Sequence, residues 1–409
     1  MHHNLSLLSL SKVLLFLLIV SINLREPYLH SREILFCLFV AVSWIYGNYR
    51  KISSMFILLS IWSISFLYNA LVPGSNALNG HWYETVINSV YLFLLVFSNK
   101  TYYRVIIKSF VFSAVIVSVL TVGLWLICYN NSVIRDTISS YFDNMMIQKG
   151  ITVLRIDSRY ILDYPFFFLW YRTSPIIIPA LGYLLIQRLR GYTTFCNFCG
   201  IILFSLALIL SGTRANMLCA VLLLFFFQVF KLFKKNHYII ATAICILTVS
   251  SGIYVANKFL TDKRSTSTHI KHLDQEAYFK TYETDYVRTF LFGWGCGSTF
   301  YSPARRMYLE LTELSHWETI RRYGVISFLL IMIFIWLRPL IKKFRYERGI
   351  SKYFYVSIVL AYIFTACTNP FLLDSLGFCV LLFFDAFFEY DTIYCVNNVQ
   401  RRKLSLRAA

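Results

Sequence analysis

A Ser-Gly-Thr turn followed by an arginine is the first segment of this chain with a chemistry of its own. It covers Ser211 to Asn216 and lies between two long apolar runs, so that Arg214 opens the second run. The free N–H groups at the start of a helix bind phosphate oxygens, and a guanidinium adds positive charge there. We therefore expect an anion site at this turn. A plain interfacial anchor is the alternative.

A glycine-rich segment follows later in the chain, from Phe290 to Ser298. Gly293, Gly295 and Gly297 alternate in it, and Arg288 precedes it. Alternating glycines let a backbone pass close to a ligand or turn sharply beneath one. The segment is not a dinucleotide-binding fingerprint, because no βαβ unit surrounds it. It predicts a substrate-binding loop, and an ordinary glycine-rich turn is the alternative.

A third segment, Thr312 to Gly324, combines carboxylates, an imidazole and arginines. Glu313, His316 and Glu318 are its candidate proton acceptors, and helical spacing places Glu318 near Arg321. A base beside guanidinium groups could remove the proton of an attacking hydroxyl. The alternative interpretation is a salt bridge between neighbouring turns of an exposed helix.

The elements that must position these groups are apolar helices. The chain has 409 residues, of which 58% are hydrophobic and 18% aromatic, and its mean hydropathy is +0.60. Its long runs are apolar on every face, which favours helices over a β-barrel. We predict an all-α polytopic membrane protein with about twelve transmembrane helices. The expected spans are 5–22, 34–49, 52–71, 83–98, 105–128, 161–187, 192–210, 213–230, 238–256, 323–341, 353–369 and 371–390.

The positions of Lys and Arg in the short loops set the orientation. They gather on the side of the predicted membrane that also holds both termini, and cytoplasmic loops carry such an excess. Two long polar segments, 129–160 and 257–322, then lie outside the cytoplasm. Arg25 and Arg32, in the first outer loop, are exceptions to this pattern.

This topology divides the chain into six parts. They are five helices (1–128), an outer loop (129–160), four helices (161–256), a large outer loop expected to form a catalytic cap (257–322), three helices (323–390) and a basic cytoplasmic tail (391–409). The net charge is +19, from 39 basic and 20 acidic residues, and anchoring to anionic lipid explains most of it. We therefore expect membrane lipids as partners and no nucleic acid.

The ten cysteines predict neither a disulfide framework nor a metal site. Most of them lie in apolar spans, where a thiol behaves as a small hydrophobic group. Cys196 and Cys199 form a single C-x-x-C pair without a second pair, and His269 and His272 lack a third ligand nearby. We predict no metal and no cofactor.

Taken in order, these segments resemble those of Wzy-type O-antigen polymerases, in the O-antigen ligase/polymerase superfamily. The matching features are an SGTRA turn that opens an outward-facing helix, a long outer loop late in the chain, an FGxGxGS motif and a TELxxxExxRxxG segment that enters the next helix. The resemblance covers the overall topology and is strongest over 205–330.

The resemblance implies a GT-C-like helical bundle in the bacterial inner membrane, with an active site that faces the periplasm. Such an enzyme joins undecaprenyl-diphosphate-linked oligosaccharide repeats by metal-independent, inverting glycosyl transfer, with a chain-length regulator protein as a partner. In that chemistry Arg214 and Arg288 would stabilise the leaving diphosphate. One of Glu313, His316 and Glu318 would act as the base.

Other arginines would help to bind the substrate under the same resemblance. Arg264 and Arg321 lie in or beside the large outer loop. Arg172 lies in a short segment, Tyr171 to Pro175, that interrupts the sixth apolar run, where the proline should kink or delay a helix. Arg172 would face a lipid phosphate or mark the true start of that helix.

Two other functions remain open on the sequence alone. An O-antigen ligase, which transfers finished polymer to the lipid A core, carries a loop histidine followed by asparagine where this chain has Glu313. His316 lies closer to Gly324 and is followed by a tryptophan, which favours the polymerase. A flippase or transporter of lipid-linked oligosaccharide would place its charges at mid-membrane, whereas the polar groups of this chain gather in an outer loop.

Overall fold

The computed structural model describes most of the chain. The described residues are 2–25, 31–45, 90–149, 153–161, 164–235, 273–277, 286–295, 297–303, 306–309, 315–347, 351–366 and 371–408, with a few isolated positions between them. The predicted spans 52–71 and 238–256 lie outside these ranges, apart from isolated positions. Of the predicted span 83–98, the structure describes the part from Val90 onward, where a 3-10 helix, η1 (Tyr91–Phe97), is found.

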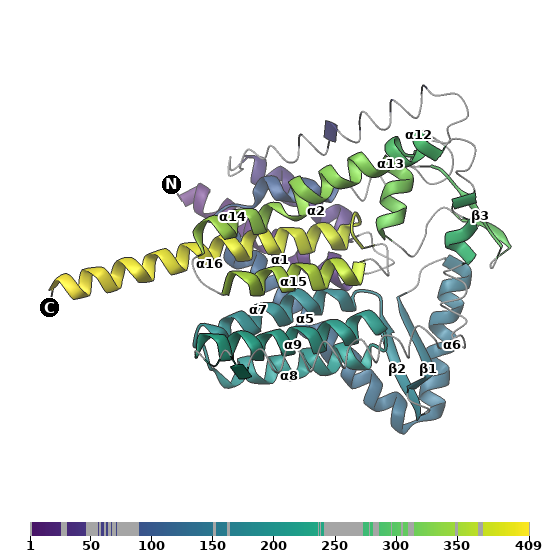
Figure 1. Ribbon diagram of the computed structural model, residues 1–409, viewed down its shortest axis with the longest axis horizontal. Coiled ribbons are helices and arrows are strands. Elements are labelled where there is room, and N and C mark those ends of the chain that lie inside the picture. The colour runs from purple at the N-terminus through teal and green to yellow at the C-terminus, as the bar shows by residue number, and fades with distance from the viewer. Residues whose placement is uncertain are drawn as a thin grey trace.

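Most of the described chain is helical, and the long helices form a bundle (Figure 1). The helices of the bundle are α1 (His2–Leu24), α2 (Ser31–Ile45), α5 (Tyr103–Asn130), α7 (Ile177–Leu189), α8 (Phe195–Leu210), α9 (Arg214–Lys234), α13 (Ser315–Ile331), α14 (Arg338–Tyr346), α15 (Ser351–Ala366) and α16 (Ser375–Ala408). A π-helical turn, η4 (Met332–Trp336), connects α13 to α14, and the 3-10 turn η2 (Ser174–Ile176) leads into α7.

Four helical stretches in the described residues are long and apolar enough to cross a membrane. They are Leu7–Leu24, Tyr103–Asn130, Arg214–Lys234 and His316–Trp336. Three shorter apolar helices accompany them, at Ser174–Leu189, Phe195–Leu210 and Lys352–Ala366. The described fold is therefore that of a mostly helical membrane protein.

The smaller elements gather at one end of the bundle, which we call the outer end. They are α6 (Ser132–Lys149), the hairpin of β1 (Leu154–Ile161) and β2 (Tyr164–Tyr171), the short helix α12 (Tyr286–Phe292), and the hairpin of β3 (Phe300–Ser302) and β4 (Met307–Leu309). Both chain termini lie at the opposite end, the inner end (Figure 1). The described parts of the two predicted outer segments, 129–160 and 257–322, thus lie at the same end of the molecule.

Two short hairpins accompany the helices of this mostly helical chain. The predicted span 161–187 is wrong in its first half, where β2 pairs antiparallel with β1 and places Leu154 opposite Tyr171. Aromatic residues crowd β2 and suit a strand, but a short run that is apolar on both faces cannot be distinguished from a helix by its period. The predicted loop 129–160 holds α6 and β1, and the predicted tail 391–409 continues α16 as helix to Ala408.

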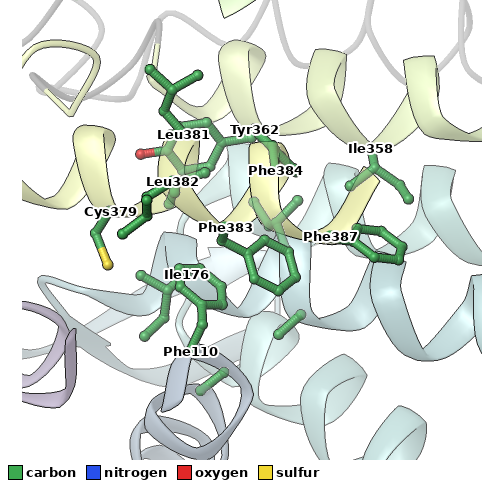
Figure 2. Close-up of a cluster of buried hydrophobic side chains, with 14 of the residues drawn as sticks. Phe110, Ile176, Ile358, Tyr362, Cys379, Leu381, Leu382, Phe383, Phe384 and Phe387 are labelled. Atoms are coloured by element: carbon green, nitrogen blue, oxygen red, sulfur yellow. The ribbon is translucent and has the colours of Figure 1, made fainter. Parts of the chain in front are cut away.

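An aromatic core joins α16 to α5, α7 and α15 (Figure 2). The rings of Phe383 and Phe110 stack with centroids 4.2 Å apart, and Tyr362 stacks on Trp336 at 5.6 Å. All four side chains are buried. Stacked aromatic pairs add specific contacts to their burial, so this core fixes how the C-terminal helix is seated in the bundle.

A buried ion network fastens the inner end. Asp391 of α16 accepts a hydrogen bond from Lys343 Nζ at 2.7 Å, and it also bonds to Arg190 and to the Tyr355 hydroxyl. Lys343 Nζ lies 3.0 Å from Glu347 Oε2 as well. Since each buried charge here has an opposite partner, the network ties α7, α14, α15 and α16 together without an isolated charge.

The close approach of α7 and α15 depends on Gly182. A Cβ added at this position would lie 2.6 Å from Cγ1 of Ile358. We expect Gly182→Ala to lower the free energy of unfolding of the detergent-solubilised chain by about 1–3 kcal/mol, because the methyl group overpacks the contact. Ile358→Ala removes the overlapping atoms, so the cost of Gly182→Ala should shrink in that background. An equal cost in both backgrounds, measured by thermal unfolding, would contradict this account of the contact.

Candidate functional site

A sharp bend in α13 shapes the outer end at the third sequence motif. Gly324 has φ 80° and ψ 164°, which interrupts the helix. The rings of His316 and Phe328 lie 5.5 Å apart across the bend, whereas a straight helix would separate residues this far apart by about 18 Å. One helical segment runs from Ser315 to this break and a second begins after Gly324, close to the predicted start of a helix at 323.

The glycine-rich loop packs its backbone against this bend. The N–H of Trp294 donates to the carbonyl of Arg321 at 2.6 Å, and the N–H of Gly295 donates to the carbonyl of Arg322 at 3.2 Å. A break in a helix frees the carbonyls of the preceding turn, and buried carbonyls need donors. The loop supplies these donors, so the second and third motifs form one structural unit.

Two glycines make this contact possible. Gly324 has a positive φ, and a Cβ there would lie 2.1 Å from the carbonyl oxygen of Leu291. Gly293 also has a positive φ, and its Cβ would lie 2.6 Å from the carbonyl oxygen of Arg322. No side chain fits either position without moving backbone. Gly295 and Gly297 of the same loop are buried.

A buried ion cluster lies beneath the loop, and we call it the Glu318 cluster. The Glu318 carboxylate accepts from Arg321 Nη2 at 2.6 Å and Nε at 3.2 Å, and its Oε1 lies 2.5 Å from Arg322 Nε. Arg321 Nη1 also donates to the Ser298 hydroxyl at 2.6 Å. Arg321 is 1% exposed. These contacts show Arg321 and Glu318 bracing the glycine-rich loop from α13.

Arg288 and His316 lie on the two helices of this unit. Arg288 lies in α12, one turn before the loop, and is half-buried; α12 packs against α13. His316, half-buried, lies in the first turn of α13. Glu313 and Arg264, predicted as base and substrate-binding residue, lie outside the described residues.

Arg214 lies at a different part of the outer end. It is the first residue of α9 and its side chain is exposed. The preceding turn is covered by the β1–β2 hairpin, because a Cβ at Gly212 would lie 2.1 Å from the Phe168 ring. The Thr213 side chain makes no capping hydrogen bond, and its hydroxyl is buried without a partner among the described residues. The start of α9 thus keeps the uncapped N–H groups that suit an anion.

The structure does not bring Arg214 and Arg288 into one packed unit. Helix α9 packs against α7, α8 and α15, whereas α12 packs against α13. The two arginines share the outer end of the bundle but are carried by separate elements.

A cluster of arginines that the motifs did not reveal lies where α1, α2, β2 and α16 meet. We call it the Arg25 cluster; it comprises Arg25, Arg32, Arg172 and Asp374. Arg25 Nη1 lies 3.8 Å from Asp374 Oδ2, and the charges of Arg172 and Arg32 act on both groups. The Tyr171 hydroxyl donates to the carbonyl of Leu24 at 2.7 Å, which holds Arg172 beside the end of α1.

This cluster carries an excess of positive charge. Burial and the charge of Arg172 lower the pKa of Arg25 to about 10. Burial also lowers the pKa of Arg172, against the attraction of Asp374. Both groups still remain cationic at neutral pH. Arg172 was predicted to bind substrate, while Arg25 and Arg32 were visible in the sequence only as exceptions to the charge pattern of the loops.

Among the described residues, no group of three His, Cys, Asp or Glu side chains could hold a metal ion. No protein-family model matches this chain, and no curated protein matches it either.

Proposed function

We propose that this chain is an O-antigen polymerase, a glycosyltransferase that joins undecaprenyl-diphosphate-linked oligosaccharides outside the cytoplasmic membrane of a bacterium. The proposal includes a GT-C-like bundle of about twelve spans with the large loop on the periplasmic side. Undecaprenyl-diphosphate-linked glycans, membrane lipids and a chain-length regulator are the proposed partners. The resemblance of the three motifs, in their order along the chain, is its starting point.

The main support for the proposal is the contact between the glycine-rich loop and the bend of α13. Two motifs that the resemblance assigns to one site are joined by main-chain hydrogen bonds and braced by the Glu318 cluster. Arg288 lies one turn before this unit. The loop and the bend would hold the Arg288 guanidinium in place before the reaction begins. A guanidinium held in this way stabilises the negative charge that develops on a leaving diphosphate.

The geometry also ranks the candidate bases. The Glu318 carboxylate is already engaged in ion pairs with Arg321 and Arg322 beneath the loop. We therefore assign Glu318 a positioning role. His316, in the same first turn of α13, is the better candidate among the described residues, with Glu313 as the other.

The proposal is tested by expressing the chain in a bacterial strain that lacks its own polymerase, and reading the lipopolysaccharide by its banding on a gel. A polymerase restores a ladder of repeats to a strain that otherwise shows core with one repeat. A ligase would instead rescue a strain whose lipid A core carries no repeat, and a flippase would rescue a strain whose intermediates face the cytoplasm. Rescue of either of those strains, without a ladder in the first, would refute the polymerase assignment.

A further inference from the structure

The Arg25 cluster holds more hydrogen-bond donors than its described neighbours use. Each guanidinium carries five N–H groups. Asp374 Oδ1 already accepts from the N–H of Gly377 at 2.8 Å, so that one oxygen is left to face the arginines. Among the described residues, no side chain is hydrogen-bonded to the Arg172 guanidinium. A ligand with several acceptor oxygens would satisfy these donors together.

Two more donors lie next to Arg172 in the chain. The Thr173 hydroxyl is buried and has no hydrogen-bond partner within the described structure, and the indole Nε1 of Trp170 is in the same state. Buried donors without a partner are rare in folded proteins, because each loses its bonds to water. Thr173 follows Arg172 in the chain and Trp170 lies two residues before it, so both donors belong to the end of the hairpin that carries Arg172.

The charges of the cluster require that this ligand be an anion. Arg25, Arg32 and Arg172 face two carboxylates, Asp374 and Glu33, and Arg32 Nε lies 2.6 Å from Glu33 Oε1. Asp374 precedes α16 and caps it, so the positive end of that helix already offsets part of its charge. The excess positive charge is therefore concentrated on Arg25 and Arg172.

The surface next to the cluster is suited to a lipid chain. Arg32 lies in the first turn of α2, and Ile34, Leu38 and Ile45 of the same helix are 57%, 49% and 73% exposed. Their spacing places them along one side of the helix. The side chain of Arg25 is 27% exposed and that of Arg32 is 26% exposed, so a headgroup can reach both.

We propose that the Arg25 cluster binds the terminal phosphoryl group of a membrane lipid. A terminal phosphate or diphosphate is favoured over a phosphodiester, because it offers more unesterified oxygens and more negative charge to the guanidinium groups. The site is separate from the glycine-rich loop and from Arg214. Only the identification of this lipid as the polyprenyl diphosphate carrier rests on the proposed function.

The site is tested with the full chain in phosphatidylcholine nanodiscs, in the absence of any sugar substrate. Binding of undecaprenyl diphosphate, phosphatidylglycerol and inorganic pyrophosphate is measured by native mass spectrometry and by titration. Arg172→Gln should weaken binding of undecaprenyl diphosphate about tenfold or more, since a charge-assisted pair is lost. Arg155→Gln is the matched control, because Arg155 lies on the same hairpin with an exposed side chain, and should leave affinity within about twofold.

Asp374→Asn provides a test in the opposite direction. Asparagine caps a helix as well as aspartate does, so the fold should persist while the competing negative charge is lost. Binding of undecaprenyl diphosphate should become several-fold tighter. Equal affinity in wild type, Arg172→Gln and Asp374→Asn would overturn the site.

The other two probes decide what the site recognises. Phosphatidylglycerol that binds as tightly as undecaprenyl diphosphate would overturn the preference for a terminal phosphoryl group. Inorganic pyrophosphate that binds as tightly would overturn the recognition of a lipid. Because the assay contains no sugar, a chain that binds the lipid but forms no ladder would contradict the proposed function and leave this site standing.

Discussion

Replacing Arg288 with alanine is expected to abolish the polymer ladder in the complementation assay while the protein still accumulates in the membrane. Arg288 lies at the edge of the rigid unit formed by the glycine-rich loop and α13. Removing one preorganised donor from a developing oxyanion slows a reaction by about a hundredfold to a thousandfold. At that rate the strain should show only core with one repeat, as measured by lipopolysaccharide banding.

Arg214→Ala should have the same result if the uncapped start of α9 holds the same diphosphate. Arg214→Lys should also be impaired, because an ammonium does not reproduce the planar fork of a guanidinium. Arg155→Ala removes an exposed arginine from the outer end and should leave the ladder intact. A normal ladder from Arg288→Ala or Arg214→Ala would remove that residue from the proposed chemistry. Arg214 and Arg288 are carried by different helices, so each variant tests its own residue.

Glu318→Gln is expected to destabilise the outer end more than any surface change. The substitution removes the negative charge that holds Arg321, which is 1% exposed and cannot move into water without opening the loop. Breaking a buried pair from one side costs about 3–5 kcal/mol. Thermal unfolding should show this loss, and limited proteolysis should cut near the glycine-rich loop sooner than in wild type.

The control for Glu318→Gln is Asp157→Asn, which breaks the exposed pair between Asp157 and Arg155. An exposed pair contributes about 1 kcal/mol or less, so this variant should unfold close to wild type. If Glu318→Gln has the same unfolding temperature as wild type, then another group balances the charge of Arg321. The bracing role assigned to Glu318 would then be wrong.

The sequence predicted the long helices well, because their signal is local. Helices α5 and α9 extend only a few residues beyond the predicted spans 105–128 and 213–230. The strand β2 was missed because its pairing partner, β1, decides its conformation, and eight apolar residues alone do not. The bend at Gly324 was also missed, since it depends on the carbonyl of Leu291, which a pattern of helix formers does not reveal.

The candidate site was predicted in part. The motifs placed Glu318 beside Arg321, and the structure shows that pair buried beneath the loop rather than exposed on a helix surface. The convergence of Arg25, Arg32 and Arg172 could not be predicted, because it depends on how α1, α2 and β2 meet. The available signal was the presence of Arg25 and Arg32 in a loop where topology requires no positive charge.

The buried ion network around Asp391 restricts where the bundle can move. It joins α7, α14, α15 and α16 at the inner end by ion pairs and hydrogen bonds. The aromatic core adds packing contacts along α16. The outer end is held by hairpins, a bent helix and arginine-rich contacts. The helices can therefore separate to admit a bulky substrate only at the outer end, while the inner end stays closed.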